Sequence, residues 1–489
     1  MRFVTYEQFG AKGDGVTDDT AAIKAAHDYA NEHDLPVRAP ADAHYYIGPA
    51  ANPATIMTDT DWGNARFTVD DRHVENNRTP IFRVASRLEP ITLNLKSLMR
   101  HQKDAGVKPG VDCYVVIKEN DVRRFIRRGA NQNNGSAQTD NFELRADGTV
   151  MHPLLWDFPR ISEAIGYPID EKPLTICGGY FTTIANEEPS TYNYYARNID
   201  IRRSNTTLMN LHHYVTGEGE TGAPYSGFVS IYNCARVTVR NCFLSPHKTY
   251  VTIGNAGVPV SMGTYDISIG SATDVLFKDC IQIGDILDTS HWGLVGSNFC
   301  KNIELDGCVF SRMDAHQGVY NYTIRNTTLG HMGLNAIGSG LMTVENCVLY
   351  GHTLVNFRSD YGSIWDGELV VRNVIWHPSC GRKVSAPCIF GGSNDGQHDF
   401  GYDCCMPRTI TLDNVYVDDS NVPEEYAGPY LWNNYNGALN ENTKDTFKEI
   451  YPYKVTEKMI IRDLSFASGK KWTLCANPLL KPAEQIIEE

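Results

Sequence analysis

The residues that could do chemistry gather between positions 285 and 366 of this 489-residue chain. Asp288, Asp314 and Asp360 stand outside the strand and turn pattern of that region, and His316 follows Asp314 by two positions. Hydrolysis of a glycosidic bond needs one carboxyl group to protonate the leaving oxygen and another to attack or to activate water. We therefore predict Asp314 and Asp360 as an acid/base pair, Asp288 as a further catalytic candidate, and His316 as a group that orients an acid or the attacking water.

Side chains that could hold a sugar chain lie near these acids in the sequence. Guanidinium groups bind hydroxyl or carboxylate groups, and aromatic rings stack on sugar rings. The predicted substrate-binding residues are Arg312, Arg358, His291, His331, Asn335, Asn356, Trp292, Tyr320 and Tyr361. For each residue taken singly, a turn, an ion pair or ordinary packing is the alternative interpretation.

Short strand-like segments, such as VTVRNC, IELDGC and MTVENC, recur along the chain around these residues. They end at Cys242, Cys280, Cys308, Thr327, Cys347, Val374 and Val415. The spacing varies while the segment stays constant, which is typical of a solenoid with loop insertions on one side. Strands as close as 19 residues leave no room for long helices between them, so parallel strands must stack as coils.

This pattern predicts an all-β fold, a single-stranded right-handed parallel β-helix with an N-terminal capping helix and a β-rich insertion. The cysteines at the ends of the segments should line the interior as small hydrophobic residues. Asparagines should close the turns with their side-chain amides. These asparagines are Asn241, Asn326, Asn346, Asn373 and Asn414.

The N-terminal segment FGAKGDGVTDDTAAIKAAHDYANEH predicts a turn at Asp14-Gly15 and a helix capped near Asp19, which suits a lid over an open coil end. This segment resembles the pectin lyase-like superfamily, in the branch with galacturonan hydrolases, rhamnogalacturonases, epimerase-like proteins and phage tailspikes. The resemblance implies the β-helix fold but no single chemistry, because the family contains hydrolases, lyases, epimerases and binding proteins.

The family's galacturonan hydrolases carry Asn-Thr-Asp, Asp-Asp, Gly-His-Gly and Arg-Ile-Lys motifs in this order. The present chain has only the fragment Gly330-His331-Met332, and it has no Asp-Asp pair between positions 274 and 395. Galacturonan hydrolysis and its catalytic residues are therefore not carried over.

Alignment of three successive segments gives one inward column: Ala315, Leu334 and Leu354. Asp314 and His316 should then point outward, and Arg358 should lie beside Gly338 of the preceding rung, which suggests a groove. Neighbouring strands are about 4.8 Å apart, so Asp314 and Asp360, two rungs apart, favour an inverting mechanism. Asp288 with Asp314 on adjacent rungs would instead favour a retaining mechanism.

Four parts of the chain are expected. They are the N-terminal cap and first coils (1–75), an inserted subdomain (76–195), the main β-helix (196–420), and the C-terminal coil end and cap (421–489). The insertion carries a basic run at Arg123, Arg124, Arg127 and Arg128, which fits a solvated face or a subunit contact better than a site for an acidic ligand.

The amino-acid composition limits the classes of molecule that the protein could bind. A net charge of -14 and a pI near 5.5 argue against nucleic acid, and they favour a neutral sugar over a polyanion. The sequence contains no apolar stretch of about eighteen residues, so it predicts no membrane-spanning helix. The chain shows no N-terminal signal peptide and its 13 cysteines are scattered, so we expect a cytoplasmic protein, or a secreted one if a leader was removed.

The sequence thus predicts a carbohydrate-active enzyme, a glycoside hydrolase or glycosyl-transferring relative, that acts on a neutral oligo- or polysaccharide without a cofactor. A lyase using Arg312, Arg358 and His316, and a tailspike-like binder without turnover, stay open as alternatives. No metal site is predicted, because the spacing of Cys380 and Cys388 is too loose for a zinc knuckle. A homo-oligomer, including a trimer, is a further alternative for which the sequence gives no direct evidence.

Overall fold

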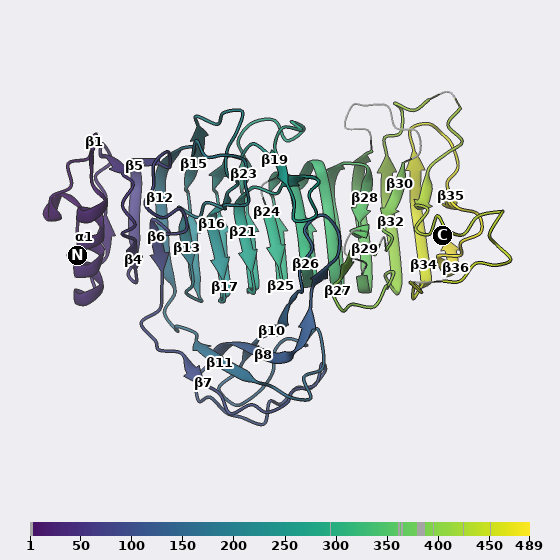
Figure 1. Ribbon diagram of the computed structural model, residues 1–489, viewed down its shortest axis with the longest axis horizontal. Coiled ribbons are helices and arrows are strands. Elements are labelled where there is room, and N and C mark those ends of the chain that lie inside the picture. Colours follow the sequence, from purple (N-terminus) through teal and green to yellow (C-terminus); the bar gives the residue numbers. More distant parts are fainter. Residues whose placement is uncertain are drawn as a thin grey trace. The chain divides into compact units, whose positions relative to one another are not determined.

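The computed structural model describes residues 3–293, 295–359, 362, 365–378, 387–394, 396–423, 425–449 and 451–489. Strands make up 50% of the chain and helices 4%. Two compact units are present: unit 1 comprises residues 1–119, 139–284 and 290–296, and unit 2 comprises residues 120–138, 285–289 and 297–489. Each unit contains a coil of stacked parallel strands (Figure 1).

The coil of unit 1 is held by strand pairing from one rung to the next. Phe181 of β12 pairs with Phe67 of β5 on one side and with His213 of β15 on the other, and the rings of Phe67 and Phe181 stack with centroids 4.4 Å apart. The coil strands of unit 1 are β1 (Asp14–Asp18), β2 (Val37–Arg38), β3 (His44–Ile47), β4 (Ala54–Ile56), β5 (Thr60–Asp70), β6 (Phe82–Val84), β12 (Leu174–Ile184), β13 (Ile199–Ile201), β14 (Thr206–Met209), β15 (His212–Thr216), β16 (Ser226–Tyr232), β17 (Ala235–Arg240), β18 (Phe243–Leu244), β21 (Tyr265–Gly270), β22 (Thr273–Lys278) and β23 (Ile281–Gln282).

A helix covers the N-terminal end of this coil, as predicted. After the short 3-10 helix η1 (Glu7–Phe9), α1 (Thr20–His33) buries Ile23, Ala26 and Ala30 and packs against β4. Within the predicted capping segment from Thr17 to Asp19, the Asp18 carboxylate accepts a hydrogen bond from the Thr20 backbone amide at 3.0 Å, whereas the Asp19 carboxylate accepts from the Lys12 and Gly13 backbone amides. No helix in the described part of the chain is long and apolar enough to cross a membrane.

The β-rich insertion is an antiparallel sheet in the order β10-β8-β11-β7. Its strands are β7 (Ile91–Thr92), β8 (Cys113–Arg124), β10 (Ser136–Leu144) and β11 (Glu163–Pro168), and a separate hairpin is formed by β19 (Tyr250–Ile253) and β20 (Pro259–Met262). The stretch between β8 and β10, together with the adjoining ends of both strands, belongs to unit 2 as residues 120–138.

The coil of unit 2 repeats a rung of three strand segments, two of which are often the halves of one bent strand. The strands are β9 (Ile126–Arg127), β25 (Cys300–Asp306), β26 (Val309–Arg325), β27 (Thr328–Tyr350), β28 (Thr353–Asn356), β29 (Trp365–His377), β30 (Cys388–Gly391), β31 (His398–Asp399), β32 (Thr409–Val417), β33 (Tyr430–Trp432), β34 (Thr456–Phe466), β35 (Thr473–Cys475) and β36 (Ala483–Glu488), while β24 (Val295–Asn298) joins the two units in sequence. All of these except β9 and β31, which pair antiparallel, take part in the parallel coil.

Asparagines close the corners of the successive rungs from Asn326 to Asn414, as the sequence predicts. Asn326, Asn346, Asn373 and Asn414 have left-handed backbones with φ between 51° and 54°. The Asn346 side-chain amide donates to the Asn326 side-chain oxygen at 3.2 Å, and Asn373 donates in turn to Asn346 at 3.0 Å. Because asparagine tolerates this backbone conformation and its amide both donates and accepts, one residue type satisfies the corner and links successive rungs.

The interior contains the predicted cysteine column. Cys242, Cys280, Cys308 and Cys347 are at most 2% exposed, and the described cysteines are all free thiols. The Cys347 thiol lies 3.1 Å from the Glu345 backbone oxygen, to which it donates. These cysteines therefore act as small core residues with a weak donor, which confirms the prediction.

The asparagine ladder generates a stability prediction. Asn346→Ala removes two side-chain hydrogen bonds and leaves alanine in a left-handed backbone, so we expect it to lower the free energy of unfolding by about 2–4 kcal/mol. Asn346→Gly loses the hydrogen bonds but tolerates the backbone, so its loss should be smaller. Urea denaturation measures both, with the exposed Glu457→Ala as control, and equal loss in the two variants would contradict the backbone part of the argument.

Candidate functional site

Asp314 lies on β26 of the unit 2 coil. It belongs to a run of six consecutive buried residues from Phe310 to Ala315, so its predicted outward direction stays a prediction. The predicted register is wrong by two residues, because Ala315 pairs with Ala336 and Met313 with Leu334. A shift of two preserves every side-chain face, since the period of a strand is two.

Asp314 lies between two guanidinium groups. Arg358 donates from Nη1 to both carboxylate oxygens of Asp314 at 2.6 and 2.9 Å, and Arg312 donates from Nη2 at 2.6 Å. Asp314 is 0% exposed, Arg312 2% and Arg358 9%. We call Arg312, Asp314, His316 and Arg358 the charged cluster. The structure therefore brings together four of the predicted site residues, although Asp314 is out of contact with solvent.

The electrostatics of the charged cluster assign a charge state to each group. Burial alone would raise the pKa of Asp314, but the positive charges of Arg312 and Arg358 outweigh it and hold the pKa at about 2. Burial and the charge of Arg358 lower the pKa of His316 to about 3, so its imidazole is neutral near pH 7. Asp314 is thus an ionised counter-ion for two arginines, and its predicted catalytic role stays a prediction.

Two predicted amides lie in register with Asp314 on the following rungs. Asn335 is in register with Asp314 and Asn356 with Asn335, and the Asn356 amide donates to the Asn335 side-chain oxygen at 2.7 Å. Asn335 itself donates to the Met332 backbone oxygen at 2.8 Å. These hydrogen bonds give both amides a structural role. Of the other predicted residues, the half-buried His331 lies on β27 and Tyr320 lies on β26.

The predicted groove beside Gly338 and Gly340 is wrong. Gly338 pairs with Trp365, not with Arg358. A Cβ atom at Gly338 would collide with the Val319 backbone, and one at Gly340 would collide with the Tyr320 ring. Glycine is needed here because the neighbouring rung approaches closely, so no open space is left for a ligand.

The remaining predicted residues are not gathered in this cluster. Asp288 is exposed in the segment 285–289 of unit 2. His291 and Trp292 belong to unit 1, where the Trp292 indole nitrogen donates to the Tyr265 hydroxyl at 3.2 Å. Asp360 and Tyr361 lie outside the described residues.

Unit 1 contains a buried polar network that sequence reasoning missed. His213 Nδ1 lies 2.7 Å from Asp266 Oδ1, and His247 Nδ1 lies 3.1 Å from Glu218 Oε1. His213, His247 and Asp266 are at most 1% exposed, and the His247 ring stacks on Tyr225 with centroids 4.0 Å apart. Such enclosed groups rigidify the coil when they are satisfied, and a substrate could not contact them.

Residues 120–138, which we call the arm, belong to unit 2 and pair with strand β31. The arm's strand β9 pairs with β31, with Arg127 opposite His398. Phe125 of the arm packs against Phe299 and Phe400, with ring centroids 4.6 and 5.0 Å away. The charge of Arg127 contributes, after burial and the charge of Arg358, to the lowered pKa of His316.

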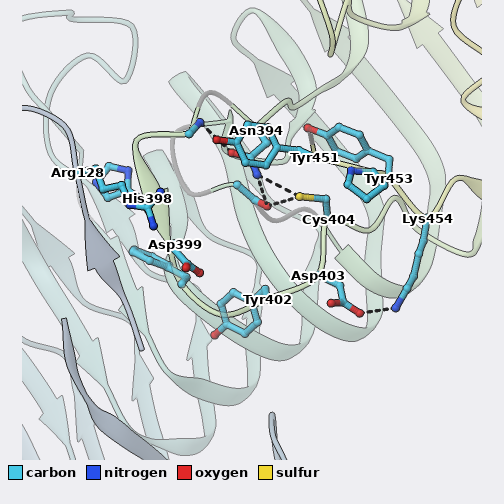
Figure 2. Close-up of a pocket in the computed structure, with 14 residues that line it drawn as sticks. Arg128, Asn394, His398, Asp399, Tyr402, Asp403, Cys404, Tyr451, Tyr453 and Lys454 are labelled. Carbon is cyan, nitrogen blue, oxygen red and sulfur yellow. Dashed lines mark hydrogen bonds and ion pairs between the residues drawn. The ribbon is translucent and has the colours of Figure 1, made fainter. Parts of the chain in front are cut away.

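The arm borders a pocket of about 490 Å³, which its residue Arg128 helps to line (Figure 2). Its volume lies in the range of about 300–1,000 Å³ usual for ligand sites. It is lined by Arg128, Gly362, Asn394, Gly396, His398, Asp399, Phe400, Tyr402, Asp403, Cys404, Tyr451, Pro452, Tyr453 and Lys454. Three tyrosine rings and two carboxylates thus line one pocket.

The two pocket carboxylates differ in their partners. Asp399 accepts a hydrogen bond from the Gly401 backbone amide at 3.0 Å, whereas Asp403 forms an ion pair with Lys454. Figure 2 shows Asp403 and Lys454 joined at one end of the pocket and Arg128 and His398 together at the other. Among the described residues, no group of three or more His, Cys, Asp or Glu side chains could hold a metal ion.

Sequence reasoning noticed the segments that build the pocket but gave them other uses. The sequence predicts a solvated face or a subunit contact for the basic run with Arg128, and it predicts no site residue in the segment from His398 to Cys404. Asp399, Tyr402 and Asp403 lie within the same short stretch, so a carboxylate and aromatic signal was available. No pattern in the neighbouring sequence predicts that Arg128 and Tyr451 line the same pocket as these residues.

No protein family and no curated protein matches the sequence. Among solved structures, the tailspike of Pseudomonas phage phi297 matches with a TM-score of 0.52 at 12% identity, over 99% of this chain and 84% of that chain. The Pseudomonas phage LKA1 tailspike matches with a TM-score of 0.47 at 12% identity, over 94% and 81%. The exopolygalacturonase of Thermotoga maritima matches with 0.38 at 10% identity, over 100% and 91%. At 12% identity the likeness to the phi297 tailspike shows the fold alone: this chain is a parallel β-helix.

The charged cluster generates a second stability prediction. Asp314→Asn leaves two buried guanidinium groups without their shared carboxylate, so we expect the free energy of unfolding at pH 7 to fall by about 3–5 kcal/mol. The exposed Asp288→Asn is the matched control and should stay within about 0.5 kcal/mol of the parent. Urea denaturation of both variants measures the difference, and equal stabilities would show that the ion pairs do not hold this face.

The same group predicts a pH dependence. The pKa of Asp314 is about 2 in the folded protein and about 3.9 in an unfolded chain. Its contribution to stability is therefore complete above about pH 4 and is lost as the pH falls toward 2. The stability difference between the parent and Asp314→Asn should shrink over that interval, and a constant difference would contradict this assignment.

Proposed function

We propose that the protein is a carbohydrate-active enzyme of the glycoside hydrolase type that binds an oligo- or polysaccharide in the pocket of unit 2. The supporting observation is the lining of this pocket, which includes the rings of Tyr402, Tyr451 and Tyr453 and the carboxylates of Asp399 and Asp403. Tyrosine presents a flat apolar ring with a hydroxyl at its edge, which suits the faces and the hydroxyl rims of sugar rings. Carboxylates at the same wall are the groups that glycoside hydrolysis requires.

The pocket also agrees with a neutral substrate. Its charged side chains are Arg128 and Lys454 on one hand and Asp399 and Asp403 on the other, so their formal charges cancel. A chain with a net charge of -14 adds no long-range attraction for a polyanion. The proposed substrate is therefore a glycan without obligatory acidic groups.

In this proposal the acid/base work belongs to the pocket carboxylates, and the charged cluster positions the surrounding strands. Asp399 and Asp403 both have exposed side chains, so a substrate can contact them. Asp314, by contrast, contacts two guanidinium groups and no solvent. The predicted Asp314 and Asp360 pair remains to be tested by the same experiment.

A screen of neutral and acidic oligosaccharides tests the proposal. Asp399→Asn and Asp403→Asn should each leave the fold intact, and the variant of the acid/base residue should lower kcat by about 10²–10⁴-fold. Tyr451→Ala should raise KM about tenfold through lost stacking. The exposed Asp445→Asn, which lies outside the pocket, is the matched control.

The products discriminate the alternatives. A hydrolase incorporates one oxygen atom from isotopically labelled water, whereas a lyase leaves an unsaturated uronate that absorbs ultraviolet light. Glycan binding without product after long incubation would favour a tailspike-like binder. Full activity of both Asp399→Asn and Asp403→Asn would remove the pocket from the mechanism and return attention to Asp314.

A further inference from the structure

We propose that unit 1 contains an accessory glycan-binding groove, which holds an extended neutral sugar chain along one corner of its coil. Two pockets of about 500 and 700 Å³ adjoin there, because Asp170 and Lys172 line both of them. Both volumes lie within the range of about 300–1,000 Å³ usual for ligand sites. The inference concerns binding alone and uses only residues of unit 1, so it does not depend on the proposed function of the unit 2 pocket.

The lining of the groove follows five successive rungs of the coil. The strand residues that pair from rung to rung are, in order, Val37, Thr60, Ile176, Leu208 and Val239. The residues three positions before these all line one of the two pockets, and they are Asp34, Met57, Pro173, Asn205 and Arg236. Neighbouring strands are about 4.8 Å apart, so four steps extend the groove over about 19 Å along the coil. An extended chain fits this shape better than a compact ligand.

Two buried polar atoms of the lining have no hydrogen-bond partner among the described residues. They are Thr58 Oγ1 and Asp170 Oδ2. Thr58 is 6% exposed, and the other carboxylate oxygen of Asp170 lies 3.2 Å from Arg203. Buried polar atoms without a partner are rare in folded proteins. A sugar hydroxyl can donate to the carboxylate, and another can bond to the threonine hydroxyl once rotation about the Cα–Cβ bond turns it toward the pocket.

The charges of the 500 Å³ pocket cancel, which favours a neutral ligand. Its cationic and anionic side chains are Arg87, Lys172, Arg203, Asp34, Asp59 and Asp170. Two of these cations already pair with carboxylates, because Arg203 contacts Asp170 and Arg87 lies 3.4 Å from Asp34. Apart from Thr58, the remaining lining residues are leucine, proline and methionine. Apolar surface with a few placed polar groups suits the C–H faces and the hydroxyl groups of sugar rings.

The same corner does not suit a peptide strand. A peptide that extends a sheet needs backbone amides and carbonyls at an open strand edge. Here the Leu174 amide donates to the Asn205 oxygen, and the Asn205 amide donates to the Ala235 oxygen, both at 3.0 Å. The Asn205 side chain donates to the Asp170 backbone oxygen at 2.9 Å, which fastens the segment 168–173 to the corner. Side chains must therefore supply the hydrogen bonds to a ligand, as they do for sugar hydroxyls.

Calorimetric titration of the full chain with glucan, mannan, galactan and galacturonan oligosaccharides tests the inference. We expect a neutral oligosaccharide to bind, and Thr58→Val to weaken its binding about fivefold through one lost hydrogen bond. Asp170→Asn should weaken it about tenfold or more, because a hydrogen bond to an ionised carboxylate is stronger. The exposed Thr92→Val and Asp42→Asn, which lie outside both pockets, are the matched controls and should bind like the parent.

Hydrogen exchange assigns the binding to the groove. The bound oligosaccharide should slow exchange of the backbone amides between Pro168 and Pro173, and Thr58→Val should reduce this protection. Because Thr58→Val removes an unpaired buried hydroxyl, its melting temperature should equal or exceed that of the parent. A lower melting temperature, exchange that no oligosaccharide slows, or binding of the galacturonan fragment alone would overturn the groove. If a neutral oligosaccharide protects this segment and no glycan is cleaved, the groove stands and the proposed function fails.

Discussion

Everything in unit 2 depends on the register in which each rung lies on the next. One interior column shows it: Leu305, Ile324, Val344, Val371 and Leu412 are paired in sequence from rung to rung, and all five are buried. Burial of such a column supplies the main favourable free energy, at about 25 cal/mol per Å² of apolar surface. Once this column is in place, the alternation of the strands decides which side chains face outward.

At the corners of the rungs, residues with a left-handed backbone also form a hydrogen bond that is repeated from rung to rung. A left-handed residue costs most side chains about 1–2 kcal/mol, but asparagine tolerates it and its amide bonds to the next asparagine. The ladder from Asn326 to Asn414 therefore fixes where each strand ends, which in turn fixes where Asp314 and Asn335 lie along their strands. Corner chemistry and site geometry are consequences of the same stacking.

The candidate pocket is lined by residues of the arm and of loops that connect the coil strands of unit 2. The arm contributes Arg128 to the lining of the pocket, and on β26 two arginines hold the buried carboxylate of Asp314. A rigid coil with functional groups on its loops and insertions is a common way to combine precision with access.

The sequence by itself determined the coil, its asparagine corners and its interior cysteines, because these follow from a strand and turn pattern repeated from rung to rung. Tertiary structure alone decided the offset of two residues between β26 and β27, since both offsets satisfy the same alternation. It also decided the burial of Asp314 and the assembly of the pocket. Arg128, Asp399 and Tyr451 meet there across more than 300 residues of chain, and no local pattern encodes a contact between segments so far apart.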